Sequence, residues 1–275
     1  MGVLNFQDIF ENVRTNPAMV HCITNYVTIN DVANIILAMG ASPIMADDPM
    51  EVCEITDMSD ALVINMGTLK QNTVRSMLLA GKKANESRHP VVFDPVGVGA
   101  STFRKETAMK LLDEIRFSVI RGNISEIKTL HQWSEKSYGV DAKKDDIITK
   151  DNQEKVIRMA KDMAVKTGAV IVITGEADLV TDGETVYFIK NGAAQMARIT
   201  GCGCMLDGVI AGFVGSNQEN VLKAAATAVS AMGICGEYAQ ENAKGTGTFK
   251  VHLMDAMSNI DEKWMERSNQ IESRS

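Results

Sequence analysis

The sequence predicts an α/β fold in which a mostly parallel central sheet carries helices on both faces. Short, nearly continuous apolar runs alternate with stretches of helical periodicity along most of the 275 residues. This is the pattern of strands that are buried on both faces and connected by helices. The composition, 45% hydrophobic but only 5% aromatic, indicates a globular protein with an aliphatic core. We expect a single domain over residues 1–275.

The apolar runs that we expect to form strands lie at residues 18–24, 42–46, 61–65, 90–93, 117–120 and 169–174. A hairpin is expected next, with arms at residues 179–181 and 186–189 and Asp182-Gly183 as its turn. Helical spacing of apolar residues predicts helices at 30–39, 69–86, 106–115 and 153–167. After Gly203 the pattern is helical to the end and predicts about three helices. The polar stretch 134–151 is the one candidate linker, too embedded to divide the chain.

Charge and cysteine usage exclude several classes of protein. The formal net charge is −7 and no cluster of Lys and Arg interrupts it, which argues against a nucleic-acid partner and against a polybasic membrane anchor. No apolar run approaches the length of a membrane span, and the first residues lack a signal peptide. The five Cys are irregularly spaced, so we expect reduced thiols and a cytoplasmic location.

In a parallel sheet of this kind, ligands bind outside the carboxyl ends of the strands. Polar residues and glycines gather after the expected strands, at 25, 45–48, 67, 94–99, 121–126 and 174–176. This convergence at one edge of the sheet predicts the functional site.

The strongest local motif is TGCGC at residues 200–204, followed by an expected helix at 205–214. Two glycines at alternate positions allow a close approach of the backbone to a ligand, and the helix N-terminus favours an anion such as a phosphate group. Cys204 would lie in the first turn, where the helix dipole favours a thiolate. The alternative is a plain turn with buried cysteines. A structural zinc site would need a second pair of ligands, which the remaining Cys do not supply.

Three further segments carry candidate chemistry. Asp94 at a strand end is either a ligand for Mg²⁺ or a turn residue before Pro95. Arg121 suits a phosphate. Glu126 is a metal ligand or half of a capping box with Asn123, and both can be true because the cap would fix Glu126 in place. Thr174, before Gly175, suits a nucleotide or a tight turn.

Several common active-site motifs are missing from the sequence. It has no phosphate-binding G-x-x-x-x-G-K-[ST] loop, no protein-kinase motif set and no G-x-S-x-G elbow. We expect His21 to be packed in a strand rather than catalytic.

These segments together resemble the ribokinase-like superfamily and, within it, the hydroxyethylthiazole kinase family. The resemblance covers nearly the whole chain. It is carried by ITNYV at 23–27, GASPIM at 40–45, NMGTL at 65–69, DPVG at 94–97, RGNISE at 121–126, GE at 175–176, TDG at 181–183 and TGCGC at 200–204.

The resemblance implies a three-layer sandwich that uses ATP and Mg²⁺ to phosphorylate the hydroxyl of 4-methyl-5-(2-hydroxyethyl)thiazole for thiamin salvage. It implies a thiazole pocket lined by Met45, Gly67 and Gly201 with Asn25 and Val27 nearby. It further implies ATP contacts from Arg121 and Thr174, Mg²⁺ positioned by Asp94 and Glu126, and Cys204 where most of the superfamily has an Asp base. A homotrimer with active sites shared between neighbouring subunits is implied as well.

Two positions depart from the family pattern, and three alternative functions remain open. Cys202 stands where Ala or Thr is usual, and Thr246 replaces a Pro in the C-terminal glycine loop. A pyrimidine-alcohol kinase or an ATP-dependent hydrate dehydratase would be expected to carry Asp at position 204. A nucleotide-binding sensor without catalytic activity is the alternative outside enzymes.

Overall fold

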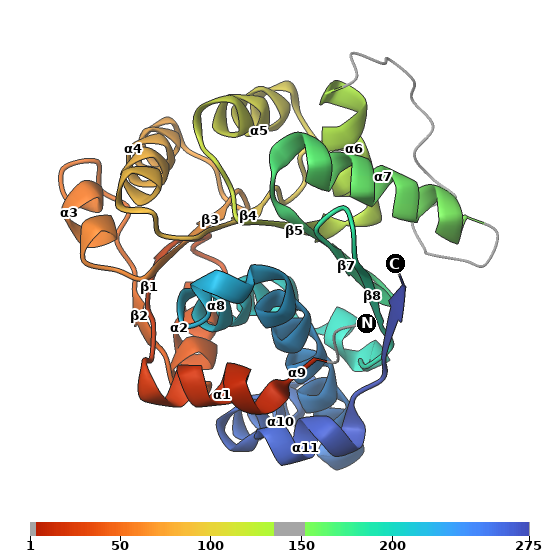
Figure 1. The fold of residues 1–275 in the computed structure, drawn as a ribbon. Helices are drawn as coiled ribbons and strands as arrows, with labels where there is room; N and C mark the ends of the chain where they lie inside the picture. Colours follow the sequence, from red (N-terminus) through yellow and green to blue (C-terminus); the bar gives the residue numbers. More distant parts are fainter. Residues whose placement is uncertain (1–3, 135–151, 275) are drawn as a thin grey trace.

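The computed structural model describes residues 4–134 and 152–274. The strands in these ranges form a nine-stranded sheet in the order β2-β1-β3-β4-β5-β6-β7-β8-β9. Figure 1 shows the sheet curving around one group of helices, with a second group on its outer face. The predicted arrangement of a mostly parallel sheet between two helical layers is therefore confirmed.

The first six strands pair in parallel, and every residue of β3 and β4 is buried, as expected for strands covered on both faces. Their bounds are β1 Met19–Ile23, β2 Ser42–Ile44, β3 Ala61–Asn65, β4 Val91–Asp94, β5 Val119–Asn123 and β6 Val170–Thr174. An antiparallel edge completes the sheet, made of β7 Asp178–Thr181, β8 Val186–Ile189 and β9 Ile271–Arg274. The hairpin expected around Asp182-Gly183 is confirmed by the pairing of β7 with β8.

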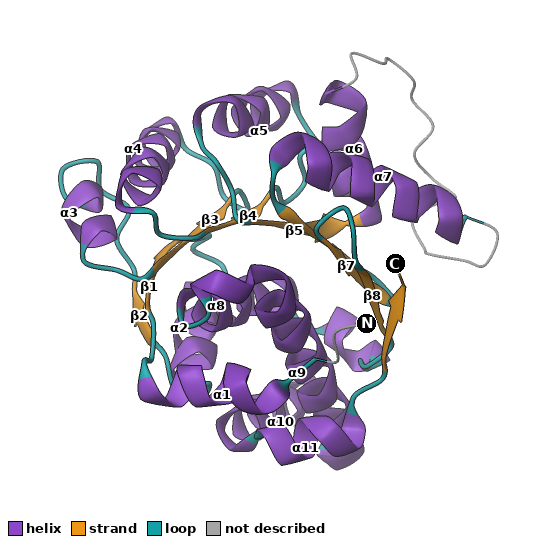
Figure 2. Cartoon of the chain, in the orientation of Figure 1, coloured by secondary structure: helices purple, strands orange, loops and turns teal. Residues whose placement is uncertain are grey.

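Helices α3 to α7 cover the outer face of the sheet (Figure 2). Their bounds are α3 Val52–Asp57, α4 Gln71–Ser87, α5 Thr102–Glu114, α6 Ile124–Ser134 and α7 Gln153–Thr167. They enclose one aliphatic core, in which Phe93 of β4 stacks on Phe117 with ring centroids 4.6 Å apart. Helix α7 ends at Gly168, whose φ of 70° places it in the left-handed region that favours glycine.

The remaining helices fill the concave face. Their bounds are α1 Phe6–Thr15, α2 Ile29–Ala38, α8 Cys202–Gly215, α9 Val221–Asn242, α10 Thr246–Asn259 and α11 Glu262–Ser268, with 3₁₀ turns η1 Ala194–Arg198 and η2 Gln218–Asn220. Helix α8 lies directly under the sheet, and its residues from Met205 to Val214 are all buried (Figure 1). Within the described ranges, no helix is both long and apolar enough to cross a bilayer.

Several sequence-based bounds were wrong. Strand β5 continues to Asn123 instead of ending at Ile120, because its backbone pairs with β6 as far as Asn123 opposite Thr174. Arg121 is therefore a strand residue. Helix α8 begins at Cys202 and not at Met205, so the predicted glycine loop at its start is already helical after Gly201.

The chain also holds elements that the sequence analysis did not predict. Helix α8 is followed by α9, α10 and α11 and by the terminal strand β9, where about three helices were expected. Helices α1 and α3 were not predicted at all. The candidate linker at residues 134–151 lies, apart from its first residue, outside the described residues.

Candidate active site

The carboxyl ends of the parallel strands bring polar side chains to one edge of the sheet. Asn65 ends β3 and lies in register with Asp94 at the end of β4. Arg121 in β5 and Thr174 at the end of β6 follow along the same edge, and Asn25 comes shortly after β1. The predicted convergence is confirmed for Asn25, Asp94, Arg121 and Thr174, whereas Asn65 was expected only as the last residue of its strand.

Helix α8 points its N-terminus at this edge. Its N-cap is Gly201, with φ of 89°, and a Cβ atom there would come within 2.6 Å of Thr28 Cγ2. Only glycine fits both the left-handed backbone and the contact with Thr28. The first N–H groups of a helix have no acceptor within it, so this turn presents donors to an anion.

Cys204, in the first turn of α8, accepts hydrogen bonds from two amides. Asn25 Nδ2 lies 3.1 Å and Asn65 Nδ2 3.4 Å from the sulfur. Both amide orientations are fixed by their other partners: Asn25 Oδ1 accepts from the Thr28 hydroxyl, and Asn65 Oδ1 accepts from the backbone N–H of Gly67. The sulfur is therefore held as an acceptor, facing the same space as the helix N-terminus.

Arg121 lies beside this sulfur, bracketed by two buried carboxyl groups. Its Nη1 atom is 3.0 Å from Asp94 Oδ2 and 3.7 Å from Asp207 Oδ1. Burial disfavours the charged guanidinium, but the charges of Asp94 and Asp207 prevail and raise the pKa of Arg121 above its ordinary value. The guanidinium also packs on Gly203, where a Cβ atom would overlap it. Gly203 thus provides the space that Arg121 occupies.

The sequence analysis missed Asp207, which is fully buried one turn after Cys204. Burial, followed by the charge of nearby Asp94, raises the pKa of Asp207 well above its ordinary value. A signal was available, because Asp207 is the one charged residue in the apolar run at 205–214. A carboxylate in such a run is rarely buried without a polar partner.

Ligand atoms of Asp94, Cys204 and Asp207 lie within 4.8 Å of one another, a grouping that could hold a metal ion. Within the described residues, Asp94 Oδ1 is buried and has no hydrogen-bond partner. Glu126 accepts from the backbone N–H groups of Gly97, at 2.8 Å, and Asn123, at 2.9 Å. Burial, and then the charge of Asp94, raises the pKa of Glu126. A cation between these carboxyl groups would relieve their repulsion.

The capping box predicted at the start of α6 is confirmed. The Asn123 side chain accepts from the backbone N–H of Glu126 at 2.9 Å, and the Glu126 carboxylate accepts from the backbone N–H of Asn123 at 2.9 Å. The cap fixes the carboxyl group of Glu126 toward the site.

A second residue that the sequence analysis missed is Arg104 of α5. Its guanidinium donates to the carbonyl oxygens of Met66, Gly67 and Val96 at 2.5 to 2.7 Å. These carbonyls belong to the loops after β3 and β4, so Arg104 ties the two loops together. No sequence signal distinguishes Arg104 from the other cations of α5.

Of the remaining residues predicted for the site, Gly67 contacts this centre through Asn25 and Asn65. Gly67 approaches Asn25 so closely that a Cβ atom at Gly67 would come within 2.7 Å of the Asn25 Cβ. Met45 is partly buried against the concave core, and Val27 is 57% exposed. Thr174 contacts the Gly122 carbonyl at the limit of hydrogen-bond distance, 3.5 Å. As predicted, His21 is packed, bound to the Thr56 hydroxyl and the Ala46 carbonyl.

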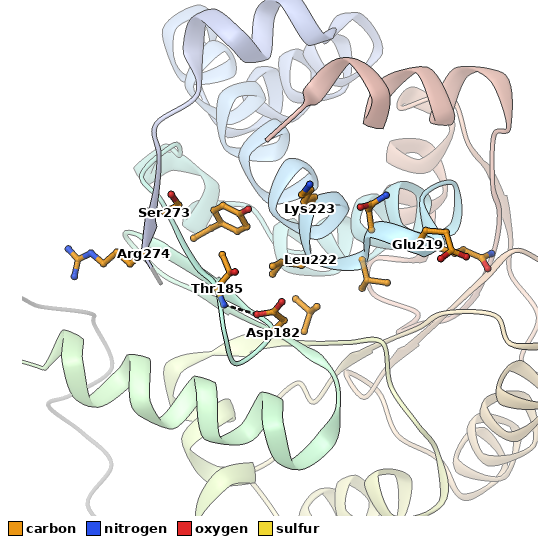
Figure 3. Close-up of a pocket in the computed structure, with 12 residues that line it drawn as sticks. Asp182, Thr185, Glu219, Leu222, Lys223, Ser273 and Arg274 are labelled. Atoms are coloured by element: carbon orange, nitrogen blue, oxygen red, sulfur yellow. Dashed lines mark hydrogen bonds between the residues drawn. The ribbon is translucent and has the colours of Figure 1, made fainter. Parts of the chain in front are cut away.

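A cavity of about 560 Å³ lies at the opposite edge of the sheet. Figure 3 shows Asp182 and Thr185 of the β7–β8 turn on one side of it and Leu222 and Lys223 of α9 on the other. None of the predicted site residues lines this cavity. This cavity is therefore not part of the site that the predicted residues form.

Known proteins of one family match this chain over most of its length. Residues 10–263 match the sequence profile of the hydroxyethylthiazole kinase family. A hydroxyethylthiazole kinase of Clostridium acetobutylicum is 48% identical over 266 residues, 96% of this chain and 97% of that protein. One of Clostridium tetani is 51% identical over 249 residues, 90% of this chain and 89% of that protein.

Solved structures give the same result. The hydroxyethylthiazole kinase protein of Pyrococcus horikoshii superposes with a TM-score of 0.89 at 33% identity, covering 98% of this chain and 99% of that one. A ribokinase-like superfamily protein of Enterococcus faecalis superposes with a TM-score of 0.60 at 13% identity, covering 96% and 91%. The second likeness bears on the fold alone.

Proposed function

The chain belongs to the hydroxyethylthiazole kinase family, and from this premise we propose that it transfers the γ-phosphoryl group of ATP to the hydroxyl of 4-methyl-5-(2-hydroxyethyl)thiazole. The product is the thiazole phosphate used in thiamin salvage. The observation that carries this proposal is the first turn of α8, where Cys204 and the free helix N–H groups face Arg121 and Asp94. An anion site, a proton acceptor and a guanidinium thus meet at one point.

The transferring group would bind at the N-terminus of α8. Its transition state is loose, so the enzyme contributes mainly positioning and neutralisation of charge. The helix N–H groups and Arg121 supply positive potential for the phosphate oxygens. Thr174, on the neighbouring strand β6, would contact the nucleotide together with Arg121.

Cys204 would accept the proton of the substrate hydroxyl as the new oxygen–phosphorus bond forms and the bond to the β-phosphate oxygen breaks. The two amide donors on its sulfur, Asn25 and Asn65, support this role because they stabilise negative charge there. A reaction with a loose transition state depends little on a general base, so the contribution of Cys204 to the rate is modest.

Asp94 and Glu126 would hold Mg²⁺ with the nucleotide. Hard carboxylate oxygens suit this ion. The Asp94 Oδ1 atom, which has no hydrogen-bond partner among residues 4–134 and 152–274, and the mutual repulsion of the two carboxyl groups support the fit. When bound, Mg²⁺ neutralises charge on the phosphate oxygens. The two side chains are held ready by Asn65, which donates to Asp94 at 2.7 Å, and by the capping box of α6.

The thiazole ring would lie among Met45, Gly67 and Gly201, next to Asn25 and Val27. At both glycines the space of a Cβ atom is taken by a side chain of the segment after β1, Asn25 at Gly67 and Thr28 at Gly201. This close packing supports a pocket wall built from these segments.

We also propose a homotrimer in which neighbouring subunits share the active sites. Tyr26, Val27 and Ile29 lie within four residues of Asn25 and are 67%, 57% and 38% exposed. Exposed apolar side chains beside a site support coverage by another subunit. Sedimentation that gives a monomer would contradict this assembly.

Two further proposals concern the whole chain. A single kinase domain over residues 1–275 is supported by the one continuous sheet in the described ranges. A cytoplasmic location is supported by its five free cysteines.

The activity is tested by coupling ADP release to a spectrophotometric assay with purified protein, ATP, Mg²⁺ and the thiazole alcohol. We expect ADP release that depends on the thiazole, with thiazole phosphate detected by mass spectrometry. A reaction without acceptor and a reaction with a pyrimidine alcohol are the controls. Intact ATP binding without thiazole-dependent turnover would contradict the proposal and favour a nucleotide sensor.

A further inference from the structure

Asp207 places a carboxyl group where the packing of α8 under the sheet does not need one. It lies on α8 three residues after Cys204, in a helix segment that is otherwise apolar and completely buried. Packing under the sheet would be served by an apolar side chain, whereas a buried carboxyl group costs free energy unless its partners compensate. The partners of Asp207 therefore indicate its purpose.

The first partner is Asn65. One oxygen of Asp207, Oδ2, accepts from Asn65 Nδ2 at 3.2 Å. The same amide nitrogen reaches Asp94 at 2.7 Å and the Cys204 sulfur at 3.4 Å. With its carbonyl oxygen turned to Gly67, Asn65 is held between the two carboxyl groups, and this fixes the donor that faces the sulfur.

The second partner is Arg121. Asp207 Oδ1 lies 3.7 Å from Arg121 Nη1 and has no hydrogen-bond partner within the described residues. Asp94 contacts the same nitrogen at 3.0 Å from another element, strand β4. The guanidinium is thus bracketed from the sheet and from α8, beside Gly203.

We propose that Asp207 is a positioning residue that acts on the reaction through Arg121 and Asn65. Its Oδ1 atom holds Arg121 for the nucleotide, and its Oδ2 atom holds the Asn65 amide against Cys204. The inference rests on the proposed function for its kinetic consequences, but the contact with Arg121 predicts nucleotide affinity independently of turnover.

The two contacts are separable by substitution. Asp207→Asn keeps the shape and the oxygen that accepts from Asn65, but it replaces the oxygen that faces Arg121 with an NH2 group, a donor against a donor. We therefore expect the KM for ATP to rise about tenfold while kcat stays within about threefold. Asp207→Ala removes both contacts, so we expect the same rise in KM for ATP together with a fall in kcat of about tenfold. The KM for the thiazole stays within about twofold in both variants, because Asp207 does not face its pocket.

A double-mutant cycle tests whether Asp207 acts through Arg121. In an Arg121→Met background, Asp207→Asn is expected to change ATP affinity by less than about twofold, since the replaced oxygen no longer faces a guanidinium. Titration with a fluorescent ATP analogue measures this without turnover. If the wild type binds the analogue but does not phosphorylate the thiazole, the proposed function fails and the inference about Asp207 is still tested.

Asp60→Asn is the matched control, because Asp60 accepts from the backbone N–H of Met19 at 2.7 Å at the far edge of the sheet. Thermal unfolding of each variant without ligand separates folding defects from positioning. The proposal is overturned if both substitutions at position 207 leave ATP affinity and kcat unchanged. It is also overturned if the effects of Asp207→Asn and Arg121→Met simply add.

Discussion

Replacing Gly203 with Ala would test the most crowded contact of the site. The new methyl group would overlap the Arg121 guanidinium, which is held by Asp94 and Asp207 and has an exposed fraction of only 12%. The side chain of Arg121 is flexible enough to move, but only by giving up these partners. We therefore expect Arg121 to leave its bracket.

The magnitude follows from two opposing effects. Ala in place of Gly in a helix stabilises it by about 0.5–1 kcal/mol. The charged hydrogen bond from Arg121 to Asp94 contributes about 1.5–3 kcal/mol, and its loss prevails. We expect a net loss of about 1–2 kcal/mol in the free energy of unfolding, or a fall in Tm of roughly 2–8 °C. ATP affinity should fall at least tenfold, because the guanidinium is displaced.

Calorimetric titration with ATP and thermal unfolding measure the two effects. Gly247→Ala is the matched control for stability, since Gly247 has the same position in the first turn of α10 and open space around its Cα. It should show the helix gain alone. Unchanged ATP affinity and unchanged Tm in Gly203→Ala would refute the reasoning.

Three further predictions follow from the site and its supports. Cys204→Asp should retain activity within about tenfold of the wild type in the ADP-release assay, because a carboxylate is an adequate base for a loose transition state; a folded but inactive variant would argue against this role of Cys204. Burial raises the pKa of Asp178 to about 7, against an ordinary value near 3.9, so the folded state binds the extra proton and stability falls as pH rises from about 4 to 7. Asp178→Asn should therefore gain Tm over the wild type at pH 8 but not at pH 4, and equal differences at both pH values would contradict the assignment. Arg104→Lys should lose about 1–3 kcal/mol of stability and speed hydrogen exchange at the Gly67 amide, because one ammonium cannot span three carbonyls; unchanged exchange would show that other contacts hold the loops.

The sequence predicts the sheet, and the edge at the carboxyl ends of its parallel strands, well. The reason is that strands buried on both faces appear in the sequence as uninterrupted apolar runs. It fails where tertiary pairing decides the structure. The residue types of Arg121, Gly122 and Asn123 predict a loop. Strand β5 continues through them because their backbone pairs with that of β6. Helix α3 is a six-residue element, too short to establish a period.

Helix α1 is a different case, since Phe6, Ile9, Phe10 and Val13 are buried at helical spacing and were predictable. The residues of the site also divide into those that the sequence could indicate and those that it could not. The Asn123–Glu126 cap could be predicted from local spacing, and Asp207 could have been found as a lone charge in an apolar run. The role of Arg104 depends on loops that are distant in sequence, so local pattern could not indicate it.

The three carbonyl contacts of Arg104 have a consequence for the polarity of the active-site backbone. In a trans peptide the C=O and N–H bonds point in opposite directions. Drawing the Met66 carbonyl toward Arg104 therefore turns the N–H of Gly67 toward Asn65, and drawing the Val96 carbonyl turns the N–H of Gly97 toward Glu126. Arg104, which lies behind the loops, thus orients two peptide groups whose N–H ends point toward the active site. The direction of these two N–H donors is set by a residue outside the site.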